Sequence, residues 1–146
     1  MVEGAGLENR YARKGIEGSN PSLSVLPFLA LPEDAMQASQ LSAKTCVPCK
    51  GGEPPLPPDR VREYLSAVPQ WSLGADGKRI RREFKFKDFV AAMRFVNRVA
   101  DLAESEGHHP DITIHWNRVT LELWTHAIGG LHENDFVMAA KIDALG

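Results

Sequence analysis

The chain has 146 residues, which is the length of one domain with a sizeable core. Its net charge of −2 is close to neutral, which argues against a protein that binds nucleic acid or an anionic membrane through a basic surface. No apolar run reaches the roughly 20 residues that a membrane-spanning helix needs.

Residues 1–42 differ in composition from the rest of the chain, because they carry Gly, Ser, Asn and Pro without sustained periodicity. Cations precede an apolar stretch there, as in a signal peptide, but nearby acidic residues and Pro27 within the stretch argue against export. We expect residues 1–42 to be a disordered or non-native extension, with Met36 as an alternative start. Residues 43–146 then form the domain, whose folded part we expect to begin near Leu56.

Cys46 and Cys49 lie in a Cys-Val-Pro-Cys segment that opens a lead-in rich in Pro and Gly. A zinc ribbon would need a second such pair, which the sequence lacks. A redox dithiol usually lies between a strand and a helix. The segment therefore favours reduced thiols in a cytoplasmic protein.

The remaining elements follow the order helix, two strands, helix, two strands, helix. A first helix begins at Pro58, strands follow near 71–73 and 80–86, and a long helix runs from its N-cap Asp88 to Gly107. Its predicted buried stripe comprises positions 89, 92, 93, 96, 99, 100 and 103. The last helix covers about 133–144. This order predicts an α+β fold, a four-stranded antiparallel sheet with three helices packed on one face. Its exposed edges could pair two copies.

The two last strands alternate apolar and polar residues on either side of Asn117-Arg118, which reads as a two-residue turn. That turn pairs position 116 with 119 and gives the hairpin one apolar face, composed of Ile112, Ile114, Trp116, Val119, Leu121 and Leu123. Continued outward, the same register places His109 opposite His126, with Cβ atoms about 5 Å apart.

Three histidines therefore mark a candidate site: the adjacent pair His108 and His109, before Pro110, and His126. Imidazole gives and takes protons near neutral pH, so this group indicates acid–base chemistry. Neighbouring residues of an extended chain point in opposite directions, so His108 and His109 need a local twist to share one pocket.

Other residues near the histidines support this interpretation or compete with it. Glu104 could orient a histidine ring, and Trp124 could stack on a flat heterocycle, whereas Trp71 is more typical of a core residue. The rival chemistry is a zinc site in which Glu104 or Asp135 joins the histidines, although no His-x-x-x-His spacing is present.

From about Lys44 onward the chain resembles the pterin-4a-carbinolamine dehydratases. The residues that carry the resemblance are Glu104-x-x-x-His108-His109-Pro110, Thr125-His126 followed by Gly130-Leu131, and Asp135 in the last helix. The resemblance implies dehydration of a 4a-hydroxytetrahydropterin to the quinonoid dihydropterin, in tetrahydrobiopterin recycling, without metal or organic cofactor. It implies catalytic roles for His108, His109 and His126, and substrate contacts for Glu104, Asp135, Trp71, Trp124 and Pro110.

The resemblance also implies partners: a homodimer or homotetramer joined through sheet edges and helices, and a link to an aromatic amino acid hydroxylase. The alternative function is a non-catalytic dimerisation cofactor for transcription. The chain departs from the family's pattern at two helix starts, where Pro57 and His132 replace the hydroxyl residues that cap well.

Overall fold

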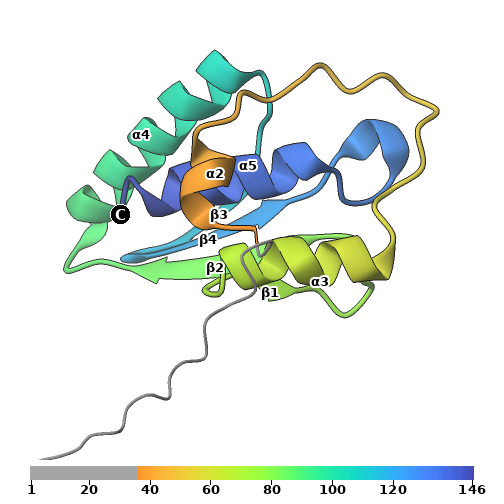
Figure 1. Cartoon of the computed structure of the whole chain (residues 1–146). Coiled ribbons are helices and arrows are strands. Elements are labelled where there is room, and N and C mark those ends of the chain that lie inside the picture. Colours follow the sequence, from red (N-terminus) through yellow and green to blue (C-terminus); the bar gives the residue numbers. More distant parts are fainter. Residues whose placement is uncertain (1–35) are drawn as a thin grey trace, which may run out of the picture. The chain divides into compact units, whose positions relative to one another are not determined.

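The computed structural model describes residues 36–146, so the expectations for residues 1–35 lie outside the described part of the chain. The elements, shown in Figure 1, are α2 (Ala38–Ser42), α3 (Pro58–Ala67), β1 (Ser72–Leu73), β2 (Ile80–Lys85), α4 (Phe89–Glu106), β3 (Asp111–His115), β4 (Arg118–Leu123), the 3₁₀ helix η3 (His126–Ile128) and α5 (Glu133–Asp143). Within residues 36–146 no helix is both long and apolar enough to cross a membrane.

The four strands form one antiparallel sheet in the order β1-β2-β4-β3. In Figure 1, α4 and α5 lie over one face of this sheet, and α3 packs against α5. The opposite face carries polar side chains, since Arg81 and Glu83 of β2 are exposed there, whereas Ile80 and Phe84 of the same strand are buried on the helix side. The α+β architecture predicted from the order of elements is therefore confirmed.

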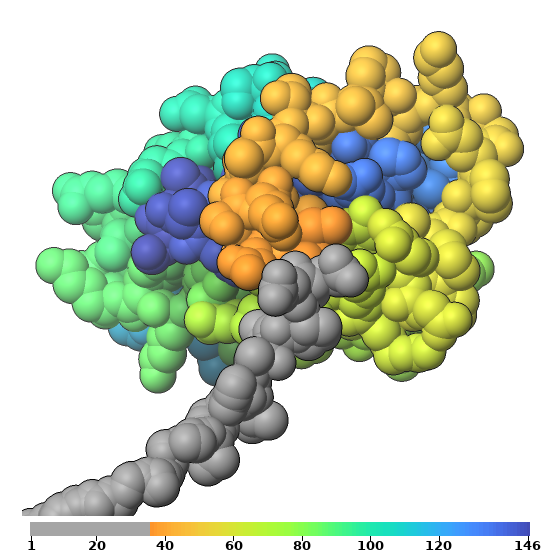
Figure 2. All heavy atoms as spheres, in the orientation of Figure 1, coloured from red at the N-terminus to blue at the C-terminus, as the bar shows by residue number. Residues whose placement is uncertain are grey.

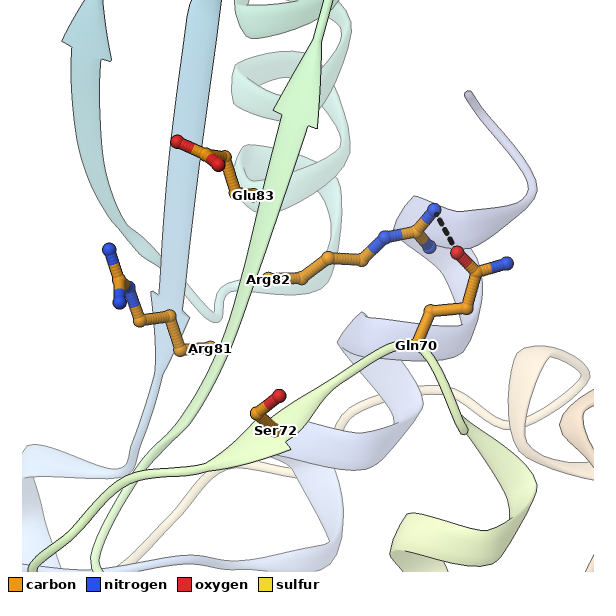
Figure 3. Close-up of a pocket in the computed structure, with 5 residues that line it drawn as sticks. All are labelled: Gln70, Ser72, Arg81, Arg82 and Glu83. Atoms are coloured by element: carbon orange, nitrogen blue, oxygen red, sulfur yellow. Dashed lines mark hydrogen bonds between the residues drawn. The ribbon is translucent and has the colours of Figure 1, made fainter.

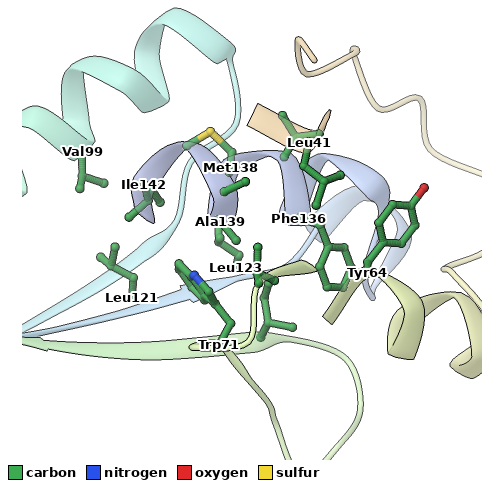
Figure 4. Packing of buried hydrophobic residues seen from close by; sticks show 14 of the residues in the cluster. Leu41, Tyr64, Trp71, Val99, Leu121, Leu123, Phe136, Met138, Ala139 and Ile142 are labelled. Atoms are coloured by element: carbon green, nitrogen blue, oxygen red, sulfur yellow. The ribbon is translucent and has the colours of Figure 1, made fainter. Parts of the chain in front are cut away.

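The core lies between the sheet and α5 (Figure 4). Leu121 and Leu123 of β4 are fully buried under Met138 and Ile142 of α5. Helix α5 is buried on almost every side, because the sheet lies below it and α2 packs against it. Such a central position explains why residues 136–140 in the middle of α5 are all apolar, without a polar face.

Helix α4 has the ends that the sequence predicted. The Asp88 carboxylate accepts a hydrogen bond from the backbone N–H of Ala91 at 2.8 Å, and Gly107 ends the helix with φ 67°. The predicted buried stripe was partly wrong, since Phe89 is 47% exposed and Phe95 is buried. Phe95 turns inward because its ring packs against those of Phe84 and Phe86, at centroid distances of 4.6 and 5.0 Å.

The hairpin register differs from the prediction by two residues. His115 pairs with Arg118, so Trp116 and Asn117 form the turn, and Trp116 has φ 50°. The cause is a contact outside the hairpin: Asn117 accepts a backbone hydrogen bond from Phe86 and donates its side-chain amide to the Phe86 carbonyl. A shift of two residues keeps the other side chains on their predicted faces, but Trp116 is 66% exposed.

Strand β3 is also more exposed than the sequence predicted. It is an edge strand of the sheet, and Ile112 and Ile114 are each 37% exposed. The pattern of alternation cannot distinguish an edge strand from a central one, which is why both isoleucines were expected to be half-buried.

The folded part begins before Leu56, contrary to expectation. Leu41 of α2 is fully buried against the core, and the following lead-in is tied to α5, because the Asn134 side chain bonds both backbone groups of Val47. Near its end, the Leu56 N–H donates to the Leu131 carbonyl at 2.8 Å. Figure 2 shows this orange and yellow segment lying over part of the blue C-terminal region.

Candidate active site

The three candidate histidines lie at one end of the sheet. His108 and His109 follow the left-handed Gly107 that ends α4, and His126 opens η3 just after β4. Since β3 and β4 are neighbours, the residues before β3 and after β4 meet at the same end. A hollow of about 210 Å³ there is lined by Gly107, His108, His109, Trp124, Thr125 and His126.

His108 is held by a buried carboxylate. Its Nε2 atom lies 2.6 Å from Oδ1 of Asp135, which is fully buried at the start of α5. The other oxygen of Asp135 accepts hydrogen bonds from the Thr125 hydroxyl and from the His132 backbone N–H, both at 2.9 Å. The carboxylate is therefore satisfied on both oxygens, and it fixes the His108 ring in one orientation.

His132 caps α5 more effectively than the sequence predicted. Its Nδ1 accepts a hydrogen bond from the Asn134 backbone N–H at 3.2 Å, while Asp135 accepts from the His132 N–H. The imidazole nitrogen thus takes the place of a hydroxyl oxygen in a capping box. For Pro57 the expectation is confirmed, since α3 has no side-chain cap.

His109 has a carboxylate partner of a different kind. Its Nε2 atom lies 2.6 Å from Oε1 of Glu104, and the two side chains are 60% and 78% exposed. Water screens such a pair, so Glu104 orients the ring but adds little stability. His108 and His109 thus point to different partners, one buried and one exposed, although both line the same hollow.

His126 contacts an indole instead of a carboxylate. The ring centroids of His126 and Trp124 are 4.0 Å apart, with an angle of 39° between the planes. The predicted pairing of His109 with His126 is wrong, because the observed register continues to place position 109 opposite 124 and His126 has left the sheet.

Four predicted site residues do not line the hollow: Glu104 and Asp135, which bond to histidines that do, and Trp71 and Pro110. Trp71 is 4% exposed in the core, where its indole N–H donates to Asp143 at 2.8 Å. Pro110 connects the histidine pair to β3 without lining the hollow. The structure therefore brings together His108, His109, His126 and Trp124, with Asp135 and Glu104 as partners of two of them.

Sequence reasoning assigned no role at the site to two residues of this neighbourhood, Thr125 and Asp111. Thr125 lies between Trp124 and His126 and donates to Asp135. Asp111 accepts the Trp124 indole N–H at 2.9 Å. The correct register would have indicated Asp111, since its partner in the ladder is Glu122, two residues before Trp124.

The two thiols lie near this site but are not part of the hollow. Both are free, and the Asn134 side-chain amide donates to Cys49 Sγ at 3.2 Å. Burial raises the pKa of Cys46 to about 12 and raises the pKa of Cys49 as well. Among residues 36–146, no cluster of three or more His, Cys, Asp or Glu side chains could hold a metal ion.

A larger hollow of about 300 Å³ lies elsewhere, over β1 and β2 (Figure 3). It contains Gln70, Ser72, Arg81, Arg82 and Glu83 and no histidine. Arg82 is already engaged there, since it donates to Gln70 at 2.9 Å and forms an ion pair with Asp143. The smaller hollow is the better candidate, because it gathers groups that transfer protons.

Comparison with known proteins identifies the family of the chain. The family model described as pterin 4 alpha carbinolamine dehydratase matches residues 54–145. A protein of Halorhodospira halophila, provisionally named a pterin-4-alpha-carbinolamine dehydratase, is 51% identical over 106 residues, 73% of this chain and 97% of that protein. A Methylococcus capsulatus protein with the same provisional name is 48% identical over 110 residues, 75% of this chain and 96% of that protein.

A solved structure is also similar. The crystal structure of a transcriptional coactivator/pterin dehydratase from Brucella melitensis is 37% identical in sequence, with a TM-score of 0.60. The similarity covers 62% of this chain and 97% of the Brucella chain.

Proposed function

The chain belongs to the pterin-4-alpha-carbinolamine dehydratase family, and from that premise we propose that it dehydrates a 4a-hydroxytetrahydropterin by histidine acid–base catalysis. The observation that carries the proposal is the convergence of His108, His109 and His126 on one hollow. The product is the quinonoid dihydropterin, together with water.

The reaction needs one proton donor and one proton acceptor. The bond between carbon 4a and its hydroxyl oxygen breaks, and the oxygen leaves as water after it takes a proton from an imidazolium. The proton on ring nitrogen 5 passes to a neutral imidazole, so the protein ends with the number of protons it began with. Each such transfer contributes about 10²–10⁴-fold to the rate.

The carboxylates act on the histidines and not on the pterin in this proposal. Asp135 is fully buried and bonded to His108, so it holds that ring while the pterin occupies the hollow. Glu104 does the same for His109 from the solvent side. Both histidines thus present a fixed nitrogen to the substrate, which is what proton transfer over a hydrogen-bond distance requires.

We also propose that two copies of the chain associate through β3. This edge strand exposes its backbone groups along one side, with Ile112 and Ile114 each 37% exposed. An edge of this kind is a template for pairing with another strand. Light scattering of the purified chain should then give at least twice the mass of one copy.

In this proposal the substrate comes from pterin-dependent hydroxylation of an aromatic amino acid, and the product enters tetrahydrobiopterin recycling. A second candidate function, a dimerisation module for transcription, is suggested by the coactivator named in the Brucella structure. Such a role does not use the imidazoles chemically, so replacing the histidines should abolish dehydration and leave a dimerisation role intact.

The direct experiment is dehydration of a synthetic 4a-hydroxytetrahydropterin by the purified chain, followed through the ultraviolet absorbance of the pterin. The proposal expects the rate of dehydration to rise in proportion to protein concentration. A rate that equals the uncatalysed rate at every protein concentration would reject it.

A further inference from the structure

We propose that Asp111 is a positioning residue, which holds the Trp124 indole against the His126 ring so that His126 is fixed for proton transfer. Trp124 then supports His126 and is not a platform on which the pterin stacks. The inference rests on the proposed function of the hollow, and it assigns a task to Trp124, which lines the hollow, and to Asp111, which bonds to Trp124.

The contacts form a chain from strand β3 to the histidine. Oδ2 of Asp111 accepts the Trp124 indole N–H at 2.9 Å, and the Trp124 ring lies 4.0 Å from the His126 ring between centroids. Because Asp111 pairs with Glu122, Trp124 is its diagonal neighbour on the polar face of the sheet. A carboxylate at position 111 can therefore reach the end of β4, where the site begins.

The Arg79 side chain also contacts the Trp124 indole. The guanidinium carbon of Arg79 lies 4.9 Å from the centroid of the Trp124 ring, within the range of a cation–π contact. Arg79 is itself anchored, because it donates to Glu122 Oε1 at 3.2 Å. The hydrogen bond to Glu122 raises the pKa of Arg79, so the guanidinium stays charged. The indole already contacts His126 and Arg79, which leaves less of its surface for a pterin.

His126 needs this support more than the other two histidines. His108 is bonded to Asp135 and His109 to Glu104, whereas no side chain or backbone group of residues 36–146 forms a hydrogen bond with the His126 ring. His126 is also exposed and opens a 3₁₀ helix of only three residues. The contact that limits its rotation is therefore the ring of Trp124.

Four variants test the chain of contacts: Trp124→Phe, Trp124→Leu, Asp111→Ala and Asp111→Asn. Misplacing a catalytic group by about 1 Å can cost about 10²-fold. We expect Trp124→Leu and Asp111→Ala to lower kcat by about 10-fold or more, with KM within about twofold of the parent value. Asp111→Asn keeps an acceptor oxygen and should recover most of that loss. Trp124→Phe keeps a ring without the N–H and should be intermediate.

Glu83→Gln is the matched control. It removes a carboxylate from the same face of the sheet, opposite Thr120 and therefore three pairs from the last pair of the ladder, Ile80 with Leu123, which adjoins Trp124. It should leave kcat and KM unchanged. The oligomeric state of each Asp111 variant is measured as well, because Asp111 begins the edge strand β3.

A readout besides turnover is the ring resonances of His126 in nuclear magnetic resonance spectra. The parent chain should show one ordered ring environment, and Asp111→Ala should show averaging between rotamers. A rise in KM with unchanged kcat in Trp124→Leu would mean that the indole binds the pterin, and would overturn the inference. Unchanged His126 resonances in Asp111→Ala would also overturn it. If the parent chain has no dehydratase activity, the proposed function fails, while the resonances still decide whether Asp111 positions His126.

Discussion

The Nε2 atom of His108 lies 2.6 Å from Oδ1 of Asp135, so a partly exposed ring at the mouth of the hollow is fixed by a fully buried carboxylate. The same carboxylate bonds Thr125, beside His126, and the His132 N–H at the start of α5. One side chain thus links the histidine pair, the segment of the third histidine and the central helix.

Replacing Asp135 should affect both stability and turnover. Asp135→Ala leaves three buried or partly buried polar groups without their acceptor, and breaking a buried pair of this kind costs about 3–5 kcal/mol. Chemical denaturation measures this loss as a lower free energy of unfolding.

Asp135→Asn separates the two effects. It preserves the shape and one acceptor oxygen, so it should fold while losing about 10²-fold in kcat through a misplaced His108. Parent-like turnover in Asp135→Asn would show that the orientation of His108 does not limit the reaction.

The sequence predicted well those elements whose ends or faces are set by residues close to them in the chain. Asp88 and Gly107 fix the ends of α4 through contacts within a few residues, and the alternation in β4 fixes its buried face. The histidine cluster was predictable for a similar reason, since His108 and His109 are adjacent and His126 follows the neighbouring strand.

The elements that sequence predicted wrongly depend on contacts between distant residues. The turn of the hairpin is set by Asn117 bonding Phe86, and the face of α4 by Phe95 packing on Phe84. For Trp71, the core position that its residue type favoured is the observed one, whereas the substrate contact implied by the resemblance has no support from the hollow, since Trp71 contacts Asp143, 72 residues away in sequence. Leu41 is buried only because α5 lies beside it.

The burial of Leu41 predicts how far the chain can be shortened. A chain that begins at Met36 keeps α2 and should have the melting temperature and turnover of the full chain. A chain that begins at Lys44 loses Leu41, and removal of a buried leucine side chain typically costs about 2–5 kcal/mol. Thermal unfolding followed by circular dichroism checks both. Equal melting temperatures for the two shortened chains would contradict the role of α2.

The raised pKa of Cys46 predicts that its alkylation depends on pH. Burial raises the pKa of Cys46 to about 12, so its reactive thiolate is scarce at pH 8 and increases only as the pH rises towards that value. The native chain should therefore react with iodoacetamide at Cys46 much more slowly than the chain unfolded in guanidinium chloride. Mass spectrometry distinguishes Cys46 from Cys49, which should also be slow because burial raises its pKa. Equal native and unfolded rates at Cys46 would contradict its burial.

A chelator tests the rival metal chemistry. Acid–base catalysis by imidazole needs no Lewis acid, so turnover should persist after exhaustive treatment with a chelator and dialysis into metal-free buffer. Loss of turnover that zinc restores would instead assign His108, His109 and His126 to a metal site.

In the proposed function, His109 and His126 serve one proton-transfer reaction in the hollow. His109→Ala and His126→Ala should each lower kcat by at least about 10²-fold, the lower end for loss of a positioned acid or base. The double variant should lose much less than the product of the two single losses, because both residues serve one step.

His115→Ala provides the control, since His115 lies on the polar face next to the hairpin turn and does not line the hollow. The most direct measurement is the turnover of a 4a-hydroxytetrahydropterin by His126→Ala beside that of His115→Ala. His126→Ala should be at least about 10²-fold slower than the parent chain, and His115→Ala should be as fast as the parent chain. An active His126→Ala together with an inactive His115→Ala would show that proton transfer takes place away from the hollow that His126 lines.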